Sequence, residues 1–351
     1  MTNSRNTARL IPKRILMKKI TIDTVAKRVG VSAATVSYAL SGKKKISAET
    51  KEKILEAVKE LDYRPDITAR NLASNKTWTV GLYASSTQNI REDSFFNNIL
   101  TGVLDVLHER NYQLMVYADY SSDSKGSSPE FRLTQPIDGV LIMNPRINDV
   151  YIEHVKERNI PYVLIGTPEK DAGETYFVDS DITAGYYAAV NYLISKGHRN
   201  IILMNGPAEY VQSENREIGY RQAFLDNGLA CDEHSIVHVR MVEEDGYRAF
   251  LQLLQEKTNA TAVITFNDTI AVGVLRALRD QKVNVPHKMA VVSAGNTMIT
   301  RIHNPTITSI DMNAYIIGSK AAELLVDVIE KRRMQPSHEI IQTHLEERES
   351  S

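Results

Sequence analysis

The residues with the most evident potential for chemistry are Cys231, His234 and His238, whose spacing is that of half a zinc site. Structural zinc takes four ligands, and no second cluster of metal-binding residues lies nearby in the sequence. We therefore expect no metal and interpret both histidines as surface residues. The chain also lacks the motifs that mark nucleotide binding, nucleophilic catalysis or zinc proteolysis. No cofactor, no catalytic residue and no enzymatic activity are predicted.

The second chemical feature is an uneven distribution of charge. Residues 1–76 hold 17 Lys and Arg against 7 Asp and Glu, whereas the remaining residues hold 25 against 36. A basic front end on an acidic body is typical of a protein whose N-terminal part binds a polyanion such as DNA. The alternative is a solvated basic tail that binds nothing.

The composition limits the class of protein. The 351 residues suffice for two or more compact units, and 42% hydrophobic and 24% charged residues are ordinary for a globular protein. No apolar run is long enough for a membrane helix, and the N-terminus lacks the apolar core of a signal peptide. A single cysteine cannot form an internal disulfide, which fits a reducing cytoplasm.

Three short helices are predicted in the basic front end. The first begins after Thr21 as N-cap and ends at Gly30, and the second is capped by Ser32 and covers Ala33–Leu40. A third follows the cap Ser47. Two short helices joined by a glycine-containing turn are typical of a helix-turn-helix. The alternative is a three-helix bundle without a role in DNA binding.

In a helix-turn-helix, the start of the second helix contacts base edges in the major groove while flanking residues hold phosphates. The residues expected on base edges are Ala33, Ala34, Ser37 and Tyr38. Phosphate contacts are expected from Ser32, Thr35, Lys43, Lys44, Lys45 and Tyr63, and Thr21 is included in this DNA-binding set.

A family resemblance is carried by the stretch TIDTVAKRVGVSAATVSYALSGKKKISAETKEKILEAVKELDYRPDITARNLAS. It resembles the headpiece of the lactose-repressor (LacI/GalR) family of bacterial transcription regulators. The resemblance implies that Asp66–Ala73 folds as a hinge helix when two subunits meet on operator DNA. Leu72, with Ala69 beside it, would then be the wedge in the central minor-groove step. Many members have arginine or histidine where this chain has Tyr38, which leaves the base contacted there open.

From Trp78 onward, β-like runs alternate with amphipathic stretches, a pattern of parallel sheets covered by helices on both faces. The predicted strands are Thr79–Tyr83, Gln113–Tyr117, Gly139–Met143, Tyr162–Ile165, Ile201–Met204, Ala262–Phe266 and Met289–Val292. The predicted helices are Ile99–Arg110, Ile182–Lys196, Arg216–Asn227, Gly246–Gln255 and Thr269–Gln281. Ligands of such sheets bind in the crevice at the carboxyl ends of the strands.

The run YLISKGHRNIILMNGPAEYVQSENREIGYRQAFLDNGL is similar to the second lobe of the same family. The pieces FFNNILTGV, PYVLIGTP and VDSD are similar to the maltose-operon repressors of Gram-positive bacteria. The implied fold is an all-α helix-turn-helix headpiece plus an α/β two-lobed, periplasmic-binding-protein-like, Rossmann-like effector domain. The expected parts are a disordered extension 1–20, a DNA-binding domain 21–64, a hinge helix and linker 65–77, and an effector-binding and dimerisation domain 78–345.

The resemblance also implies a ligand cleft between the lobes. Arg216 matches the arginine that grips oxygens of the effector, because its guanidinium fork suits bidentate recognition. Asn267 matches a further polar contact, and Asp268 is expected to cap the following helix. Phe95, Phe96 and Asn97 lie where the helix of the first lobe faces the cleft; the rings would either stack on a sugar or pack in the core.

Two positions depart from the family pattern. Where members usually have aspartate after the strand that ends at Val292, this chain has Ser293-Ala294-Gly295-Asn296, and Asn296 is taken as the substitute polar contact. Gly166 stands where some members have an acidic residue.

The predicted function is a repressor of a carbohydrate-utilisation operon, cytoplasmic and nucleoid-associated when bound to its operator. It would bind a palindromic operator as a homodimer, because one headpiece contacts one half-site, and it would respond to a small-molecule effector, a sugar. The alternatives are a regulator with a purine or phosphocarrier corepressor and a solute-binding protein. The basic headpiece and the lack of an export signal oppose the latter.

Changing Lys43, Lys44 and Lys45 together to alanine should weaken binding to all operator sequences similarly and flatten its salt dependence. Each neutralised phosphate contributes about −0.9 to the slope of log K against log salt. Fluorescence anisotropy over a salt series measures both effects. A loss confined to one operator position would instead show that these lysines contact bases.

Overall fold

The computed structural model describes residues 20–41, 46–63, 76–84, 94–118 and 136–351. It divides into two compact units, residues 1–76 and 77–351, which are described separately below. None of the described helices is long and apolar enough to cross a membrane.

The N-terminal unit contains the three predicted helices. They are α1 (Ile22–Val29), α2 (Ala33–Ser41) and α3 (Ala48–Glu60). Gly30 ends α1 with a left-handed φ of 76°, a conformation that costs glycine little. At the start of α2, Ser32 Oγ accepts a hydrogen bond from the backbone N–H of Thr35 at 3.1 Å. Ser47 Oγ accepts one from Thr50 at the start of α3, so local capping fixes where the helices begin.

Small and β-branched side chains close the core of this unit. Ala26, Ala39 and Ala57 are buried between the helices, which lets the helices pack closely. The buried cluster consists of Val25, Ala26, Val36, Ala39, Ile54, Ala57 and Tyr63.

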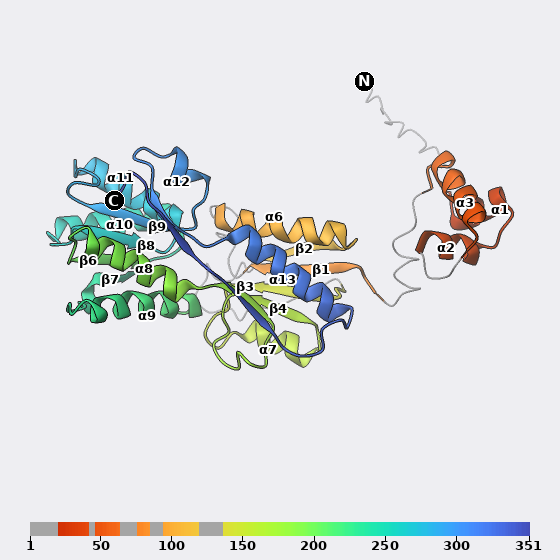
Figure 1. Ribbon diagram of the computed structural model, residues 1–351, viewed down its shortest axis with the longest axis horizontal. Coiled ribbons are helices and arrows are strands. Elements are labelled where there is room, and N and C mark those ends of the chain that lie inside the picture. The colour runs from red at the N-terminus through yellow and green to blue at the C-terminus, as the bar shows by residue number, and fades with distance from the viewer. Residues whose placement is uncertain (1–19, 42–45, 64–75, 85–93, 119–135) are drawn as a thin grey trace, which may run out of the picture. The chain divides into compact units, whose positions relative to one another are not determined.

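The larger unit contains two six-stranded sheets, one in each lobe (Figure 1). The first sheet has the order β11-β5-β4-β3-β1-β2 and is parallel throughout. Its strands are β1 (Thr79–Ala84), β2 (Gln113–Ala118), β3 (Gly139–Met143), β4 (Tyr162–Ile165), β5 (Phe177–Ser180) and β11 (His338–Ile341). In its register, Val80 lies beside Leu114 on one side and Gly139 on the other.

The second sheet has the order β12-β10-β9-β8-β6-β7, and only β12 runs antiparallel to its neighbour. Its strands are β6 (Ile201–Asn205), β7 (Ile236–His238), β8 (Ala262–Thr265), β9 (Ala290–Ala294), β10 (Thr308–Asp311) and β12 (His344–Glu346). The chain passes between the lobes three times, after β5, after β10 and after β11.

Helices cover both faces of each sheet, because neighbouring strand residues point to opposite faces. Leu141 and Met143 pack under α6 and α13, whereas Val140 and Ile142 pack against α7. In the second lobe, α8 and α9 cover one face, and α10 and α11 cover the other. The helices are α6 (Ser94–Glu109), α7 (Val150–Glu157), α8 (Ile182–Ser195), α9 (Val211–Asp226), α10 (Glu243–Gln255), α11 (Asp268–Asp280), α12 (Met298–Ile302) and α13 (Ala314–Ile329).

The predicted fold class is confirmed, and all seven predicted strands lie in the two sheets. The predicted starts of α6, α9 and α10 are too late. Their first turns are rich in polar residues, and α6 already begins at Ser94. The short strands β5, β7, β10, β11 and β12 were not predicted, because each is only three or four residues long and carries polar or charged residues that interrupt its apolar pattern.

Glycines allow helix backbones to touch within both lobes. A Cβ at Gly102 of α6 would lie 2.2 Å from the backbone oxygen of Tyr315 in α13, and one at Gly318 would lie 2.1 Å from the backbone oxygen of Ile99. Gly219 of α9 meets the Thr183 carbonyl of α8 in the same way. Any larger residue at these crossings must push the helices apart.

We expect Gly102→Ala to lower the free energy of unfolding by about 1–3 kcal/mol, the usual cost of overpacking. Urea denaturation followed by circular dichroism measures it. Gly173→Ala is the matched control, because no atom lies within 4 Å of the added Cβ, and it should stay within about 0.5 kcal/mol of wild type. Equal stability of the two variants would contradict a tight α6–α13 crossing.

Candidate functional site

A cavity between the two lobes lies at the carboxyl ends of the strands, where ligands of parallel sheets bind. The first lobe contributes Phe95, Ile99, Asn144, Ile165, Asp179, Ser180 and Ile317 to its lining. The second lobe and the segments entering it contribute Ile182, Tyr210, Gln212, Arg216, Met241, Phe266, Asn267, Ala294, Gly295 and Met312. A ligand here would contact both lobes at once.

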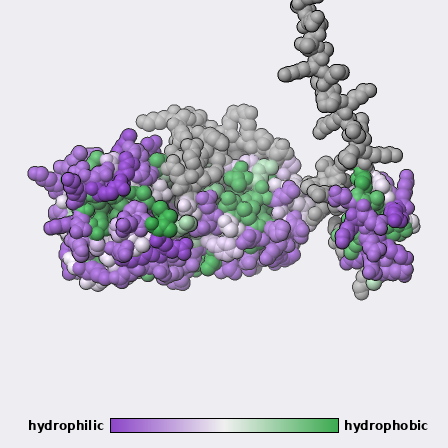
Figure 2. All heavy atoms as spheres, turned by 90° about the horizontal axis from the view of Figure 1, so that it is seen from above, coloured by the Kyte–Doolittle hydropathy of each residue, from purple (hydrophilic) through white to green (hydrophobic). Residues whose placement is uncertain are grey.

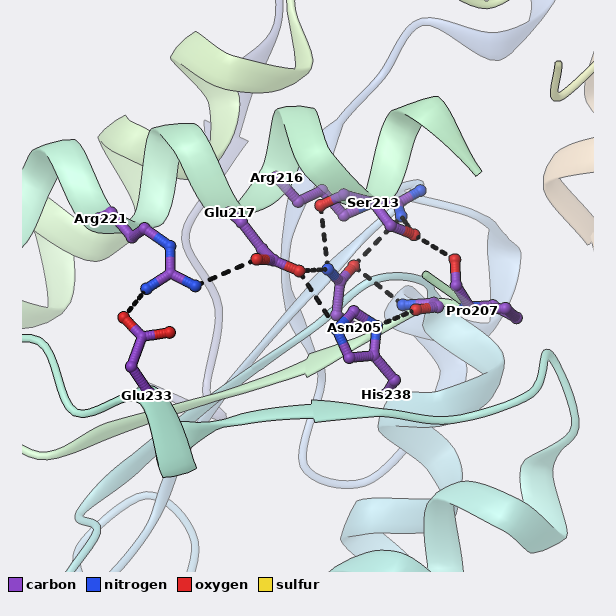
Figure 3. A network of polar contacts seen from close by, with 9 residues as sticks. Asn205, Pro207, Ser213, Arg216, Glu217, Arg221, Glu233 and His238 are labelled. Carbon is purple, nitrogen blue, oxygen red and sulfur yellow. Dashed lines mark hydrogen bonds and ion pairs between the residues drawn. The ribbon is translucent and has the colours of Figure 1, made fainter. Parts of the chain in front are cut away.

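Arg216 brings a positive charge to this cavity from α9 (Figure 3). Its Nη1 donates to Asn205 Oδ1 and to Ser213 Oγ, each at 3.3 Å. Its guanidinium carbon lies 5.3 Å from the ring centre of Phe266, within the range of a cation–π interaction. The guanidinium is therefore held next to an aromatic face, a pairing suited to a ligand with both hydroxyls and an apolar surface.

Asp179 supplies the acidic group in the lining. It lies in β5 and accepts hydrogen bonds from the backbone N–H and hydroxyl of Thr167 at 2.7 and 2.8 Å, and from the backbone N–H of Ser180 at 2.8 Å. Burial raises the pKa of this carboxyl to about 6, against the opposing effect of these donors and of Arg216. Because its oxygens are already bonded, Asp179 shapes the cleft more than it offers a free acceptor.

Gln212 is an additional polar group that the sequence did not single out. Its residue is 5% exposed, and its Oε1 is buried without a hydrogen-bond partner among the described residues. Gly166 makes room for this amide, since a Cβ there would lie 2.1 Å from Gln212 Nε2. A buried acceptor of this kind is costly unless something donates to it, and a ligand hydroxyl in the cavity is a suitable donor.

Three of the six predicted effector-binding residues line the cavity, namely Phe95, Arg216 and Asn267. Phe96 does not: it is 1% exposed within the core under α6, because it lies about 100° around the helix from its neighbour Phe95. Asn97 is exposed outside the lining.

Asn296 is also absent from the lining. Its side chain donates to Asp311 at 2.8 Å and accepts from Arg348 at 2.6 Å, so it ties the turn after β9 to the edge of the sheet. The expected cap Asp268 is wrong as well: Asn267 Oδ1 accepts from the backbone N–H of Ile270 and caps α11. Asp268 is instead buried and accepts hydrogen bonds from the hydroxyls of Ser293, Thr297 and Ser309.

Some of the residues predicted to contact bases are exposed on α2 of the N-terminal unit. Ala34 and Ser37 are exposed and Tyr38 is half-buried, whereas Ala33 packs partly against the core. Thr21 is exposed, and the hydroxyls of Ser32 and Thr35 lie 2.8 Å apart. Ser32, Ala34 and Thr35 stand at the N-terminal end of α2, where a recognition helix meets DNA.

Tyr63 lies differently from its predicted place among phosphate contacts. Its residue is 8% exposed and belongs to the core of the three helices, because its ring fills the space beyond the end of α3. Lys43, Lys44, Lys45, Ala69 and Leu72 lie outside the described residues.

No cluster of metal-binding side chains large enough to hold a metal is present in the described part of the chain. His234 and His238 are both exposed, as predicted for surface residues. His238 has partners that the sequence did not suggest: its Nδ1 lies 2.6 Å from the Gly206 carbonyl oxygen and its Nε2 lies 3.2 Å from Glu217 Oε1.

Comparison with known protein families places both units. Residues 21–66 match the family described as bacterial regulatory proteins, lacI family, and residues 190–351 match the periplasmic binding protein-like domain. The first match covers the helix-turn-helix, and the second covers much of the lobe that carries Arg216.

Similar proteins extend over nearly the whole chain. The transcriptional regulator CelR of Thermobifida fusca is 31% identical over 95% of this chain and 98% of its own. Catabolite control protein A of Priestia megaterium is 29% identical over 95% of this chain and 99% of its own. The structure of a CelR–cellobiose complex superposes with a TM-score of 0.74 at 30% identity, covering 95% of this chain and 100% of that one.

Proposed function

The chain belongs to the LacI family of bacterial regulatory proteins, which are DNA-binding transcriptional regulators and not enzymes. From this premise we propose that it represses a carbohydrate-utilisation operon by binding a palindromic operator as a homodimer. We propose further that a sugar in the cleft between the lobes causes release from the operator. It would act where the DNA is, in the cytoplasm, on the nucleoid.

The observation that carries the sugar proposal is the combination of groups in the cavity. The Arg216 guanidinium stands beside the Phe266 ring, and Gln212 presents a buried acceptor. Sugars offer vicinal hydroxyls for a planar fork of donors and C–H faces for aromatic rings. The cellobiose bound by the relative CelR makes a β-linked disaccharide the first candidate to test.

Control of DNA binding follows if the sugar favours one arrangement of the lobes. A ligand shifts an equilibrium only by the difference of its affinities for the two states. Because the cavity is lined by residues of both lobes, its affinity depends on how the lobes are arranged. We propose that the sugar-bound arrangement disfavours pairing of the two segments that follow the headpieces.

The dimer surface that we propose combines exposed apolar residues of both lobes. Met298 and Ile302 of α12 are each 64% exposed, and Leu104 of α6 and Val116 of β2 are 45% and 42% exposed. Figure 2, seen from above relative to Figure 1, shows hydrophobic residues on the surface of both lobes. Apolar surface of this kind marks an interface, and one that spans both lobes would make the dimer sensitive to their arrangement.

Met298→Asp should convert the dimer to monomers and weaken operator binding, because it places a charge in an apolar interface. Analytical ultracentrifugation and fluorescence anisotropy measure the two effects. Leu225→Asp is the matched control, since Leu225 is 70% exposed on α9, on the other side of its lobe from α12 (Figure 1). A wild-type monomer at micromolar concentration with full operator affinity would contradict the dimer, and an unaffected Met298→Asp dimer would contradict this surface.

Arg216→Ala should leave the fold and operator binding nearly intact and weaken the effector at least about tenfold. A charge-assisted hydrogen bond lost in a closed site costs about 1.5–3 kcal/mol, and each factor of ten is about 1.4 kcal/mol. The measurement is operator affinity by anisotropy, with and without a sugar selected by thermal shift from a panel that includes cellobiose, sugar phosphates and purines.

Arg248→Ala is the control for this test, because Arg248 is an exposed arginine of the same lobe outside the cavity. A mutant at Arg216 that responds at the wild-type ligand concentration would contradict the proposed site. A ligand that tightens wild-type operator binding would identify a corepressor instead.

A further inference from the structure

A short stretch of each lobe meets the other lobe beside the cavity. In the first lobe this stretch is Pro145–Ile147, which follows β3, and in the second lobe it is Glu209–Val211, which leads into α9. Arg146 and Tyr210 lie opposite each other there in an isolated antiparallel bridge. We call the two stretches together the clasp. It connects the lobes by backbone contacts, whereas the sheets of the two lobes remain separate.

Two backbone hydrogen bonds cross between the lobes in the clasp. The Ile147 N–H donates to the Glu209 carbonyl at 2.8 Å, and the Val211 N–H donates to the Pro145 carbonyl at 3.3 Å. Each bond replaces hydrogen bonds to water, so its net contribution to stability is small. A contact of this size can form and break as the lobes move.

The side chains of the bridge reinforce this contact. The guanidinium carbon of Arg146 lies 5.4 Å from the centre of the Tyr210 ring, within the range of a cation–π interaction. Arg146 Nη2 also donates to the Tyr210 hydroxyl at 3.4 Å. Tyr210 is 5% exposed, and a cation–π interaction is stronger where water is excluded.

Each half of the clasp is fixed within its own lobe. The Arg146 N–H donates to Asp149 Oδ2 at 3.1 Å, and Asp149 is also the N-cap of α7. In the second lobe, Ser213 Oγ donates to the Pro207 carbonyl at 2.8 Å and accepts from Arg216 Nη1 at 3.3 Å (Figure 3). The turn that this bond closes contains the second half of the clasp, so the clasp and the guanidinium of the effector site are supported by the same turn.

The clasp is also continuous with the lining of the cavity. Asn144 and Gln212, which adjoin its two halves in the chain, line the cavity, and so does Tyr210 within it. An arrangement of the lobes that opens the clasp must therefore move these lining residues apart.

Resting on the proposed function of the cleft, we propose that Arg146 and the other residues of the clasp are positioning residues for the effector. They hold the start of α9 against the first lobe, so the clasp and the effector stabilise the same arrangement of the lobes. Coupling of this kind is reciprocal. Opening the clasp therefore weakens effector binding, and fixing the clasp reproduces the effect of the effector on DNA binding.

The bridge can be fixed by a disulfide. The two backbone bonds come from the neighbours of Arg146 and Tyr210, which makes them a non-hydrogen-bonded pair with Cα atoms about 4.5 Å apart, a separation that a disulfide spans. In full-length protein with Cys231→Ala, which removes the native free cysteine, Arg146→Cys/Tyr210→Cys should form this disulfide within one subunit on oxidation. Non-reducing electrophoresis and peptide mass spectrometry detect it, and Arg146→Cys alone is the matched control without a bridge.

The linked protein should bind operator DNA about 5- to 150-fold more weakly than the same protein after reduction, the usual range of coupling between two sites. Fluorescence anisotropy measures both forms, and Arg146→Cys alone should bind equally in both. A double variant that stays unlinked, or a linked form with unchanged operator affinity, would overturn the proposal. Tighter operator binding by the linked form would support the coupling and overturn release by the effector, the direction given under the proposed function.

Val211→Pro tests the effect of the clasp on the effector, because it removes the Val211 N–H with little change to α9. Val211 is the first residue of this helix, where proline is well accommodated, and Tyr210 before it has an extended backbone with φ −95° and ψ 134°. With cellobiose as the probe, calorimetry should show an affinity about 2- to 12-fold lower, the worth of one neutral hydrogen bond.

Val211→Ala is the control for this variant, because it keeps the N–H and lies outside the cavity lining, and it should bind cellobiose as the wild type does. Unchanged affinity in Val211→Pro, or an equal loss in both variants, would overturn the role of this bond in effector binding. If cellobiose binds to no form of the protein, the sugar proposal loses its first candidate, while the disulfide experiment decides the coupling of the clasp independently.

Discussion

Parallel strands of two sheets end at one crevice, and this constraint organises the larger unit. A strand that ends there leaves polar groups pointing at the opposite lobe, and each must bond to protein or ligand. Asp179 near the end of β5 and Asn205 at the end of β6 are hydrogen-bonded within their own lobes. Arg216 and Gln212 of the second lobe also line the shared space, and Gln212 Oε1 is buried there without a hydrogen-bond partner among the described residues.

Two glycines follow strands that end at the crevice. Gly166, which follows β4, and Gly295, which follows β9, have positive φ values of 127° and 129°. Residues with a side chain rarely adopt this backbone conformation. Gly166 leaves space that Gln212 fills, and Gly295 packs against the buried Asp268.

The fold was predictable from the sequence because short apolar strands and amphipathic helices alternate, and because Thr21, Gly30, Ser32 and Ser47 mark helix ends by local chemistry. The site was predictable only for residues whose place on a helix is enough to bring them to the cavity, such as Phe95 and Arg216. The exclusion of Asn296 from the cavity depends on Arg348, more than fifty residues away in the chain. Likewise, nothing local indicates that His238 lies against Glu217, because β7 and α9 meet only in the folded lobe.

The glycine crossings have a mechanical consequence. Where the backbones of α6 and α13 touch at Gly102 and Gly318, no layer of flexible side chains lies between the helices that could shear. A close crossing of this kind couples α6 to α13, so a displacement of one helix must be accompanied by a displacement of the other. The three segments after β5, β10 and β11 connect the lobes. A change in the arrangement of the lobes must therefore be taken up by backbone rotations in these segments.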